Sequence, residues 1–346
     1  MLPMARLLAL QTAVPPYVLE QDVVAAAGRE VFGARGDIDR LMSVFANTGI
    51  ARRYSCVPMD WYRQSHGWAD RNALYLEHAV SLLETVARAA IAEAGLAPDA
   101  IDAIVSVSTT GVATPSLDAL IVERLNLRRD IQRLPIVGLG CAGGAMGLAR
   151  AGALARAQPG SRVLFLCVEL CALTFRKSDL SKANVVAMAL FGDGAAGAVL
   201  STVGAGPALA ANGEHTWPRS LGVMGWSVEE DGLRPIFSQS IPGLVEARLG
   251  PVLLDFLGKN DIRRDDIEAF ACHPGGIKVV DALERILGLA PGGLADSRAI
   301  LRDYGNMSAV TVLFVLKRMR IRDQPRRTLL AALGPGFSAA FLVLEP

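Results

Sequence analysis

The chain has 346 residues, 51% of them hydrophobic, which is enough to bury a large core as one domain or as two halves. With 35 Lys and Arg against 34 Asp and Glu, the net charge is +1, which argues against binding to nucleic acid or to an anionic membrane surface. Aromatic residues make up only 6%, so platforms for base stacking are not expected either.

The cysteine count and the lengths of the apolar runs indicate in which cellular compartment the protein resides. The five cysteines are an odd number without a CxxC pair, which argues against a disulfide framework or a structural zinc site and favours the reducing cytoplasm. The N-terminal apolar run ends before Gln11 and is too short for the core of a signal peptide. No apolar run is continuous over the about 20 residues that a membrane span needs, so we expect no stable membrane insertion.

Hydrophobic spacing predicts alternating strands and helices along the first part of the chain. We expect strands at 7–10, 100–107, 134–137, 162–168 and 195–200, and helices at 20–32, 38–47, 71–95, from 117, within 138–155 and at 184–191. The strands at 100–107, 134–137 and 162–168 read as buried. After Thr202 the sequence becomes small, glycine-rich and unpatterned, so we divide the chain into residues 1–203 and 204–346.

The second half shows the same kinds of element. We expect strands at 209–211, 221–226, 267–272, 328–333 and 338–344, helices at 245–257, 277–287 and 306–319, and a proline-marked segment at 232–242.

The two halves also share sequence. The segment IDAIV at 101 resembles IEAFA at 267, an offset of 166 residues, and Gly140-Cys141 resembles Gly305-Asn306 at an offset of 165. These offsets predict two stacked α/β halves related by a pseudo-twofold axis, each with a mixed sheet.

Residues 134–155, LPIVGLGCAGGAMGLARAGALA, read as a buried strand, a glycine-rich turn and a helix of small residues. Cys141 lies where this helix begins, and the helix N-terminus favours the thiolate, which is the nucleophilic form of cysteine. The glycines permit a tight turn, as in a nucleophile elbow with sulfur in place of a serine oxygen. The alternative is a buried cysteine that merely opens a Gly/Ala helix.

Two further residues are candidates to join Cys141. If the halves face each other, Cys141 and Asn306 begin equivalent helices near the pseudo-axis, and His273 lies where a strand ends, a common place for functional groups. An imidazole can hold a cysteine as a thiolate–imidazolium pair, and the Asn amide and the His N–H can donate to an oxyanion. A turn histidine and a helix N-cap asparagine remain the alternatives.

Other charged and sulfur-bearing residues carry weaker signals. Arg52 and Arg53 are adjacent and could meet the phosphates of a nucleotide-bearing substrate, although a solvated basic turn is the alternative. We expect Cys167, Cys171 and Cys272 to be packing residues.

Several segments together resemble the type III polyketide synthases, the chalcone-synthase-like branch of the thiolase fold. They lie in order over most of the chain from about residue 100 to the end: GLGCAGGAMGLARA at 138, VELCALTF at 168, ALFGDGAA at 189, CHPGG at 272, YGNMSA at 304 and GPGFS at 334. The resemblance implies an α/β fold with thiolase-like duplicated αβαβα layers, a homodimer, no metal and no resident cofactor, with acyl-CoA and malonyl-CoA as substrates.

The resemblance also assigns roles to the three candidates. Cys141 would carry the starter acyl group and the growing chain as a thioester. His273 and Asn306 would bind the carbonyl oxygen of malonyl-CoA and stabilise the enolate left by decarboxylation. That enolate would attack the acyl-cysteine in a Claisen condensation, and the cycle would repeat.

Further positions follow from the same resemblance. Phe191 matches a phenylalanine that gates the entrance between the CoA tunnel and the cavity. Thr174, Thr114 and Ser308 match positions that line the cavity, and the loop of Thr114 would reach the partner subunit. Gly336, in the Gly-Pro-Gly loop, completes the expected substrate-binding set.

The chain also departs from the plant-like members of that family. Pro235 stands where they have a second gating phenylalanine, with Phe237 two residues on, and the loop GFGPG reads ALGPG here. The segments VELCALTF and GLRPIFSQSIPGL look more like bacterial members, many of which accept fatty acyl-CoA starters and make alkylpyrones or alkylresorcinols. We therefore expect that substrate class.

Three other functions compete with this interpretation. A ketoacyl-ACP synthase III would use the same Cys–His–Asn logic but would condense once with malonyl-ACP; the GNMS and GPGFS segments and the lack of a basic patch favour the polyketide branch. A catalytically silent member of the fold is opposed by the joint presence of Cys141, His273 and Asn306. A cysteine hydrolase lacks an Asp placed to partner His273.

Overall fold

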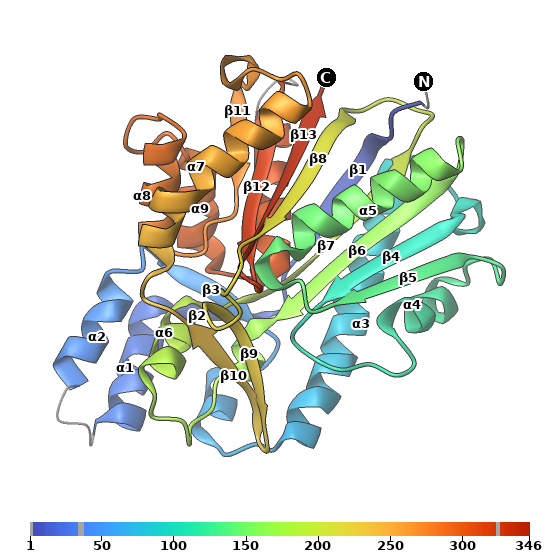
Figure 1. Cartoon of the computed structure of the whole chain (residues 1–346). Helices are drawn as coiled ribbons and strands as arrows, with labels where there is room; N and C mark the ends of the chain where they lie inside the picture. Colours follow the sequence, from blue (N-terminus) through green and yellow to red (C-terminus); the bar gives the residue numbers. More distant parts are fainter. Residues whose placement is uncertain (1–2, 34–37, 323–325) are drawn as a thin grey trace.

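Nine strands pair into one mixed sheet in the computed structural model, which describes residues 3–33, 38–322 and 326–346 (Figure 1). The strand order is β11-β12-β13-β8-β1-β7-β6-β4-β5. The bounds are β1 (Arg6–Ala13), β4 (Ala103–Ser108), β5 (Gln132–Val137), β6 (Arg162–Leu170), β7 (Asp193–Ser201), β8 (Ala208–Thr216), β11 (Ala269–Cys272), β12 (Thr328–Gly334) and β13 (Ser338–Glu345). Two small sheets pair β2 (Tyr17–Glu20) with β3 (Arg52–Ser55) and β9 (Met224–Glu229) with β10 (Gly232–Phe237).

The pairing pattern repeats on the two sides of the sheet, which confirms the predicted duplication. On one side β1–β7 and β7–β6 are antiparallel and β6–β4 is parallel. On the other side β8–β13 and β13–β12 are antiparallel and β12–β11 is parallel. β5 extends the first side, and no strand in the described ranges takes the equivalent place beyond β11. The predicted boundary at residue 203 falls in the connection between β7 and β8.

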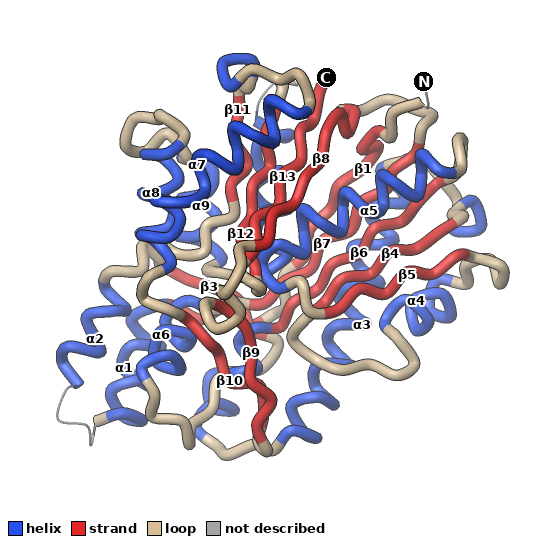
Figure 2. The backbone as a smooth tube through the Cα atoms, in the orientation of Figure 1, coloured by secondary structure: helices blue, strands red, loops and turns tan. Residues whose placement is uncertain are grey.

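Helices cover both faces of each half and give five layers. The middle layer holds α5 (Gly143–Ala157) and α10 (Thr311–Arg322), which pack against strands of both halves (Figure 2 shows α5 running along the sheet). One outer layer holds α3 (Trp68–Glu93) and α4 (Leu117–Leu125), and the other holds α7 (Ile241–Lys259) and α8 (Ile277–Ile286). This is the predicted thiolase-like αβαβα arrangement.

The apolar residues of α3, the longest helix in the described part of the chain, recur at helical spacing. α3 buries one apolar face against the sheet, and it ends before Gly95, whose φ of 66° lies in the left-handed region that favours glycine. The remaining helices α1 (Gln21–Phe32), α2 (Ile38–Ala46) and α6 (Lys182–Leu190) pack together beside the β9–β10 hairpin, and α9 (Ala295–Tyr304) packs beside α10. None of the helices in the described part of the chain is long and apolar enough to cross a membrane.

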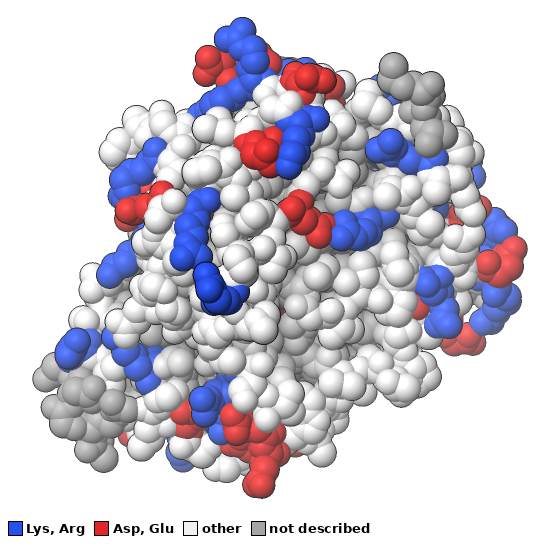
Figure 3. Space-filling model, in the orientation of Figure 1, with Lys and Arg blue, Asp and Glu red and all other residues white. Residues whose placement is uncertain are grey.

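The prediction that residues 134–137 form a buried strand is wrong. β5 lies at the edge of the sheet with β4 as its neighbour, and Leu134 and Val137 are 40% and 74% exposed. The surface beside the end of β5 carries few charged side chains (Figure 3). An apolar strand at an edge has the composition of a core strand, so the sequence pattern does not separate the two.

Three further elements differ from expectation. Asn306 does not begin a helix, because a short turn (Ser308–Val310) separates it from α10. The proline-marked segment 232–242 forms β10 and the first residues of α7, since Pro235 and Pro242 occupy positions that need no backbone donor there. The polar helix α9 has no clear apolar spacing and is absent from the predicted elements.

Candidate active site

Cys141 lies in a single helical turn (Gly140–Ala142) that leads directly into α5. Gly140 has a φ of 50°, and a Cβ there would lie 2.6 Å from Cδ of Pro335. A Cβ on Gly334 would come within 2.7 Å of the backbone oxygen just before the turn. The Gly-Pro-Gly turn between β12 and β13 therefore closes on the cysteine turn, and both halves fix the nucleophile's position.

One cavity of about 420 Å³ brings together the three residues predicted to act as a unit. Cys141, His273 and Asn306 line it and are 8%, 4% and 3% exposed. They come from the start of α5, the end of β11 and the segment before α10, as the duplication predicted for the cysteine and the asparagine. A buried nucleophile, an imidazole and an amide thus share one cavity.

The amide of Asn306 has a defined orientation. Its Oδ1 accepts a hydrogen bond from the backbone N–H of Ser308 at 2.8 Å, and its Nδ2 donates to the carbonyl of Gly275 at 3.2 Å. The main chain of Asn306 is bridged to Phe191, as its N–H donates to the Leu190 carbonyl at 2.8 Å. Because Nδ2 carries two hydrogens, the second can face Cys141 or a ligand in the cavity.

The ring of His273 is available for a ligand. Its backbone N–H donates to the carbonyl of Ala331 at 2.8 Å, whereas both ring nitrogens are buried without a partner among the described residues. Burial lowers the pKa of His273 to about 4, so the ring is neutral at pH 7 and carries one N–H donor.

The thiol of Cys141 is protonated at neutral pH. Burial raises its pKa to about 12, and hydrogen bonds from the side chains of Ser308 and Asn306 act in the opposite direction. This is the reverse of the lowering expected from the helix start, because the thiolate is far more costly to desolvate than the helix terminus can offset. Ionisation therefore needs a compensating charge in the same cavity.

Glu169 lies on the far side of Ser308, and no sequence motif singles it out. It is the last residue but one of β6, is fully buried, and accepts a hydrogen bond from the backbone N–H of Thr109 at 3.0 Å. Burial raises its pKa to about 7, with hydrogen bonds from the Thr109, Thr110 and Ser308 side chains opposing the rise. The only sequence signal is a carboxylate at the end of an otherwise apolar strand. Ser308 thus lies between this carboxyl and Cys141, with a φ of 48°.

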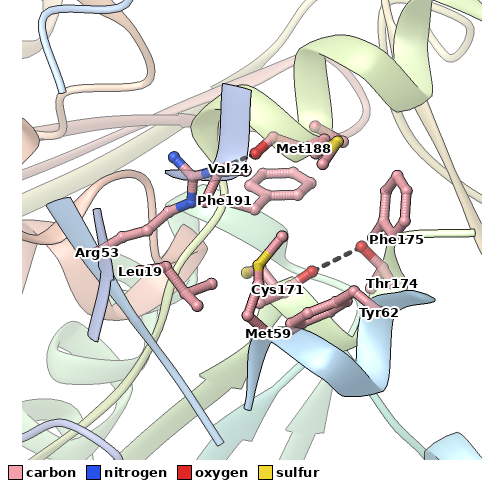
Figure 4. A pocket seen from close by; sticks show the side chains of 12 residues that line it. Leu19, Val24, Arg53, Met59, Tyr62, Cys171, Thr174, Phe175, Met188 and Phe191 are labelled. Carbon is pink, nitrogen blue, oxygen red and sulfur yellow. Dashed lines mark hydrogen bonds between the residues drawn. The ribbon is translucent and has the colours of Figure 1, made fainter. Parts of the chain in front are cut away.

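Phe191 lies between the catalytic cavity and a second, smaller one. Its ring centroid is 5.5 Å from those of Trp226 and Phe237, and Phe237 lines the catalytic cavity. Phe237 thus lies beside Phe191 although it is shifted by two residues from the plant-like position. The smaller cavity, of about 30 Å³, is bounded by Phe191, Cys171 and Met188 (Figure 4).

Thr174 lines this smaller cavity and not the one that holds Cys141. Its hydroxyl donates to the carbonyl of Cys171 at 2.7 Å, as drawn in Figure 4. Cys167, Cys171 and Cys272 are completely buried, in agreement with their expected packing role.

The expectation that Arg53 binds CoA phosphates is wrong. Arg53 is 1% exposed, and its guanidinium donates to Gln21 Oε1 and to the carbonyls of Met188 and Ala189. Burial lowers its pKa to about 10. Arg52 is exposed, but it does not line the catalytic cavity and lies near Asp303. Side chains alternate along β3, so two adjacent arginines point to opposite sides.

Thr114 and Gly336 do not line the catalytic cavity within one chain. Thr114 is exposed on the loop before α4. Gly336 lines a surface groove of about 740 Å³ whose apolar walls include Val112, Val137 and Leu221. A contact of Thr114 with a substrate would require a second copy of the chain.

Comparison with known proteins agrees with this architecture. The family model for the N-terminal domain of chalcone and stilbene synthases matches residues 3–207, and the C-terminal domain model matches residues 209–345. A putative chalcone synthase of Bacillus subtilis (strain 168) is 37% identical over 99% of this chain and 99% of its own length. An alpha-pyrone synthesis polyketide synthase-like protein of Mycobacterium tuberculosis (strain H37Rv) is 29% identical over 97% of this chain and 90% of its own.

A solved structure extends the likeness to three dimensions. The crystal structure of 1,3,6,8-tetrahydroxynaphthalene synthase from Streptomyces coelicolor A3(2), a bacterial type III polyketide synthase, has a TM-score of 0.94 and 28% identity, covering 98% of this chain and 99% of that one. The chain belongs to the chalcone and stilbene synthase family and is a type III polyketide synthase, a transferase that condenses malonyl-CoA.

Proposed function

We propose that this synthase loads a fatty acyl group from CoA onto Cys141, extends it with malonyl-CoA by repeated decarboxylative condensation, and releases an alkylpyrone or alkylresorcinol. The observation that supports the chemistry best is the one cavity in which the buried side chains of Cys141, His273 and Asn306 meet. Its remaining walls are largely apolar, which suits a hydrocarbon chain and keeps water from the reacting atoms.

The first step transfers the starter. The proton of the Cys141 thiol passes to the neutral imidazole of His273, so that thiolate and imidazolium form together and each stabilises the other in the buried site. The thiolate attacks the starter's thioester carbonyl, the bond to CoA sulfur breaks, and CoA leaves as its thiol after taking the proton from His273. The product is an acyl thioester on Cys141.

The second step forms the carbon–carbon bond. The N–H of neutral His273 and the second Nδ2 hydrogen of Asn306, which turns from Cys141 to the substrate, donate to the thioester oxygen of malonyl-CoA. The bond to the carboxylate breaks, CO₂ leaves, and its electron pair forms an enolate held by the two donors. The enolate carbon attacks the acyl thioester, and Cys141 leaves as a thiolate, ready to take back the lengthened chain.

The apolar walls of the smaller cavity behind Phe191 support the proposal that the starter carries a hydrocarbon chain. Its walls include Leu19, Val24, Met59 and Met188, which are apolar (Figure 4). At about 30 Å³ it accommodates a long chain only after these side chains move. Methionine side chains are flexible and repack readily, so Met59 and Met188 are the walls that would give way.

A second candidate function needs no acyl starter. The high structural likeness to a tetrahydroxynaphthalene synthase, together with the small volume behind Phe191, favours a synthase that builds its product from malonyl-CoA alone. In that case Phe191 and Met188 would close the end of the cavity instead of gating a tail pocket.

We further propose that the active form is a homodimer. The unpaired edge of β5, the exposed Val112, Val137 and Leu221, and the groove between them form an apolar surface of the kind that is buried between subunits. Pairing of β5 with its symmetry mate would satisfy the edge. Thr114, which lies near this surface in sequence, would then belong to the partner's cavity.

A product assay tests the proposed function. Purified protein is incubated with malonyl-CoA alone and with acyl-CoAs from acetyl to long-chain, beside a Cys141→Ala control, and products are identified by mass spectrometry. We expect pyrones or resorcinols that contain the acyl starter and two or three malonyl-derived units. Naphthalene products from malonyl-CoA alone would support the second candidate. A single condensation that needs malonyl-ACP would refute both.

Two cavity variants sharpen the assay. Met188→Ala enlarges the small cavity and should shift the preference towards longer starters, whereas Val24→Phe fills it and should shift the preference towards shorter ones. Equal starter profiles in the two variants would contradict a tail pocket behind Phe191.

A further inference from the structure

The β9–β10 hairpin forms part of the cavity wall but belongs to no larger sheet. Its strands pair only with each other in the described part of the chain, and in Figure 1 the hairpin extends away from the nine-stranded sheet. Met224 and Phe237 line the catalytic cavity, and Trp226 packs on Phe191 with the ring centroids 5.5 Å apart. The position of the hairpin over the cavities therefore depends on its two ends and on contacts of its side chains.

One carboxylate ties the tip of the hairpin to a neighbouring segment. Asp231 Oδ1 lies 2.6 Å from Nε of Arg176, and Asp231 Oδ2 accepts a hydrogen bond from the hydroxyl of Ser178 at 2.8 Å. The side chains of Arg176 and Asp231 are 12% and 34% exposed, so solvent screens this ion pair less than one on an open surface. Figure 3 shows acidic side chains gathered at this tip, with basic side chains beside them.

Arg176 is itself fixed by its surroundings. Its backbone N–H donates to Oδ1 of Asn184 at 3.3 Å, and its carbonyl accepts a hydrogen bond from Nδ2 of Asn184 at 2.7 Å. Its guanidinium also faces the carboxylate of Asp179 at 3.7 Å. Arg176 directly follows residues 171–175, which contribute to one wall of the smaller cavity. The ion pair thus joins the tip of the hairpin to that wall.

The residue after Asp231 rests against the same wall. A Cβ on Gly232 would lie 3.2 Å from Cδ of Arg71, so the tip lies directly against that side chain. Arg71 in turn donates hydrogen bonds to two carbonyls within residues 173–175. Burial lowers the pKa of Arg71, and the carboxylate of Asp231 acts in the opposite direction. The tip and the wall of the smaller cavity therefore meet at one charged cluster of Arg71, Arg176 and Asp231.

We propose that Asp231 is a positioning residue that limits the length of the acyl starter. By holding the tip of the hairpin on Arg176, it keeps the ring of Trp226 against Phe191 and so keeps the passage to the smaller cavity narrow. The inference rests on the proposed function, because it concerns an acyl starter whose chain passes Phe191.

The other end of the hairpin is fixed independently of the tip. The N–H of Ser238 donates to the carbonyl of Val223 at 2.9 Å, and α7 begins shortly after it. Trp226 pairs with Pro235 midway between this base and the tip, and each strand of six residues spans about 20 Å. A hairpin released at its tip can therefore tilt about its base, and Trp226 would move away from Phe191.

Starter loading tests the proposal. Asp231→Asn removes the charge and keeps the size of the side chain, and Arg176→Gln removes the cation that Asp231 shares with Asp179. Single-turnover acylation of Cys141 is measured with hexanoyl-CoA and with palmitoyl-CoA. The ratio of the palmitoyl rate to the hexanoyl rate should rise roughly three- to tenfold in each variant, the effect of losing one charge-assisted contact. Glu230→Gln is the matched control, since Glu230 is exposed at the same tip, and it should keep the wild-type ratio.

A double variant tests whether the two residues act through one contact. Asp231→Asn should change the starter ratio of the Arg176→Gln protein by less than about twofold, because the ion pair is already lost there. Independent roles in folding would instead multiply the two single effects, and that result would contradict the proposal. Asp231→Glu keeps the charge, so its ratio should lie closer to the wild type than that of Asp231→Asn.

Hydrogen exchange follows the hairpin without any substrate. The main-chain N–H groups of residues 224–237 should exchange roughly tenfold faster in Asp231→Asn and in Arg176→Gln than in the wild type, whereas those of β6 and β12 should be unchanged. Glu230→Gln should exchange at the wild-type rate. Unchanged exchange of the hairpin in both variants, or an equal change of acylation rate for both starters, would overturn the proposal.

Failure of the proposed function would give a different pattern. Faster exchange of the hairpin in Asp231→Asn and Arg176→Gln, with no acylation of Cys141 by either starter in any of the proteins, would refute the acyl starter and its selection by length. The same result would uphold Asp231 as the residue that holds the hairpin in place.

Discussion

Replacing Asn306 with aspartate isolates the amide hydrogens from the rest of the residue. The carboxylate of Asn306→Asp would keep an oxygen for the backbone N–H of Ser308, which Asn306 Oδ1 accepts at 2.8 Å, but it would have no N–H for Gly275 or for a substrate. The variant therefore removes one of the two donors that hold the enolate oxygen. Loss of one such donor costs about 10²–10³ in rate, or about 2.7–4 kcal/mol of transition-state stabilisation.

The assay measures two steps separately. Decarboxylation is followed as conversion of malonyl-CoA to acetyl-CoA, and acyl transfer is followed as the mass increase of Cys141 in a single turnover. We expect decarboxylation by the Asn306→Asp variant to fall by about 10²–10³, with acylation within about tenfold of the wild type, because the enolate forms only in the second step.

A control replaces a different asparagine with the same residue. Asn212 is exposed on β8 and does not line the cavity, so Asn212→Asp should decarboxylate at the wild-type rate. Equal losses of acylation and decarboxylation in Asn306→Asp would show that Asn306 holds the local fold instead of the enolate. An unchanged decarboxylation rate would refute its role as a donor.

Three further predictions concern stability and assembly. Arg53→Lys should lower the free energy of unfolding by about 3 kcal/mol in urea titrations, since buried carbonyl groups lose donors, whereas Arg52→Lys should change it by less than about 0.5 kcal/mol. Folding lowers the pKa of His273 from 6.5 to about 4, so the unfolded chain takes up a proton there before the folded chain does as the pH falls. The free energy of unfolding of the wild type should therefore fall by about 2 kcal/mol more than that of His273→Gln between pH 7 and pH 4.5. Parallel curves of unfolding free energy against pH for the two proteins would contradict this. Val137→Arg should convert a dimer into a monomer by light scattering, and an unchanged mass would exclude the β5 edge from the interface.

The duplicated fold and the catalytic group can be predicted from the sequence because their signals are local. Cys141 and His273 each lie where a regular element begins or ends, and matching offsets relate Cys141 to Asn306 across the halves. Strand pairing then repeats in the way the offsets imply. The position of Asn306 relative to α10 is mispredicted because its side chain bonds within a short turn, which mimics a helix start in sequence.

The residues that are mispredicted depend on contacts between distant segments. Arg53 reads as a surface cation, yet it packs under α6 because β3 places alternate side chains on opposite faces. Likewise, Val137 has the composition of a core residue, and only the strand order places it at an edge.

The central claim is that Cys141 carries the acyl chain, and trapping that intermediate tests it most directly. The protein is mixed with a long-chain acyl-CoA in the absence of malonyl-CoA, quenched in acid, and examined by intact and peptide mass spectrometry. We expect one acyl group per chain on the peptide that contains Cys141, none in Cys141→Ala, and loss of the label when malonyl-CoA is added. Condensation products formed without acylation of Cys141, or with the acyl group on another residue, would contradict the proposed mechanism.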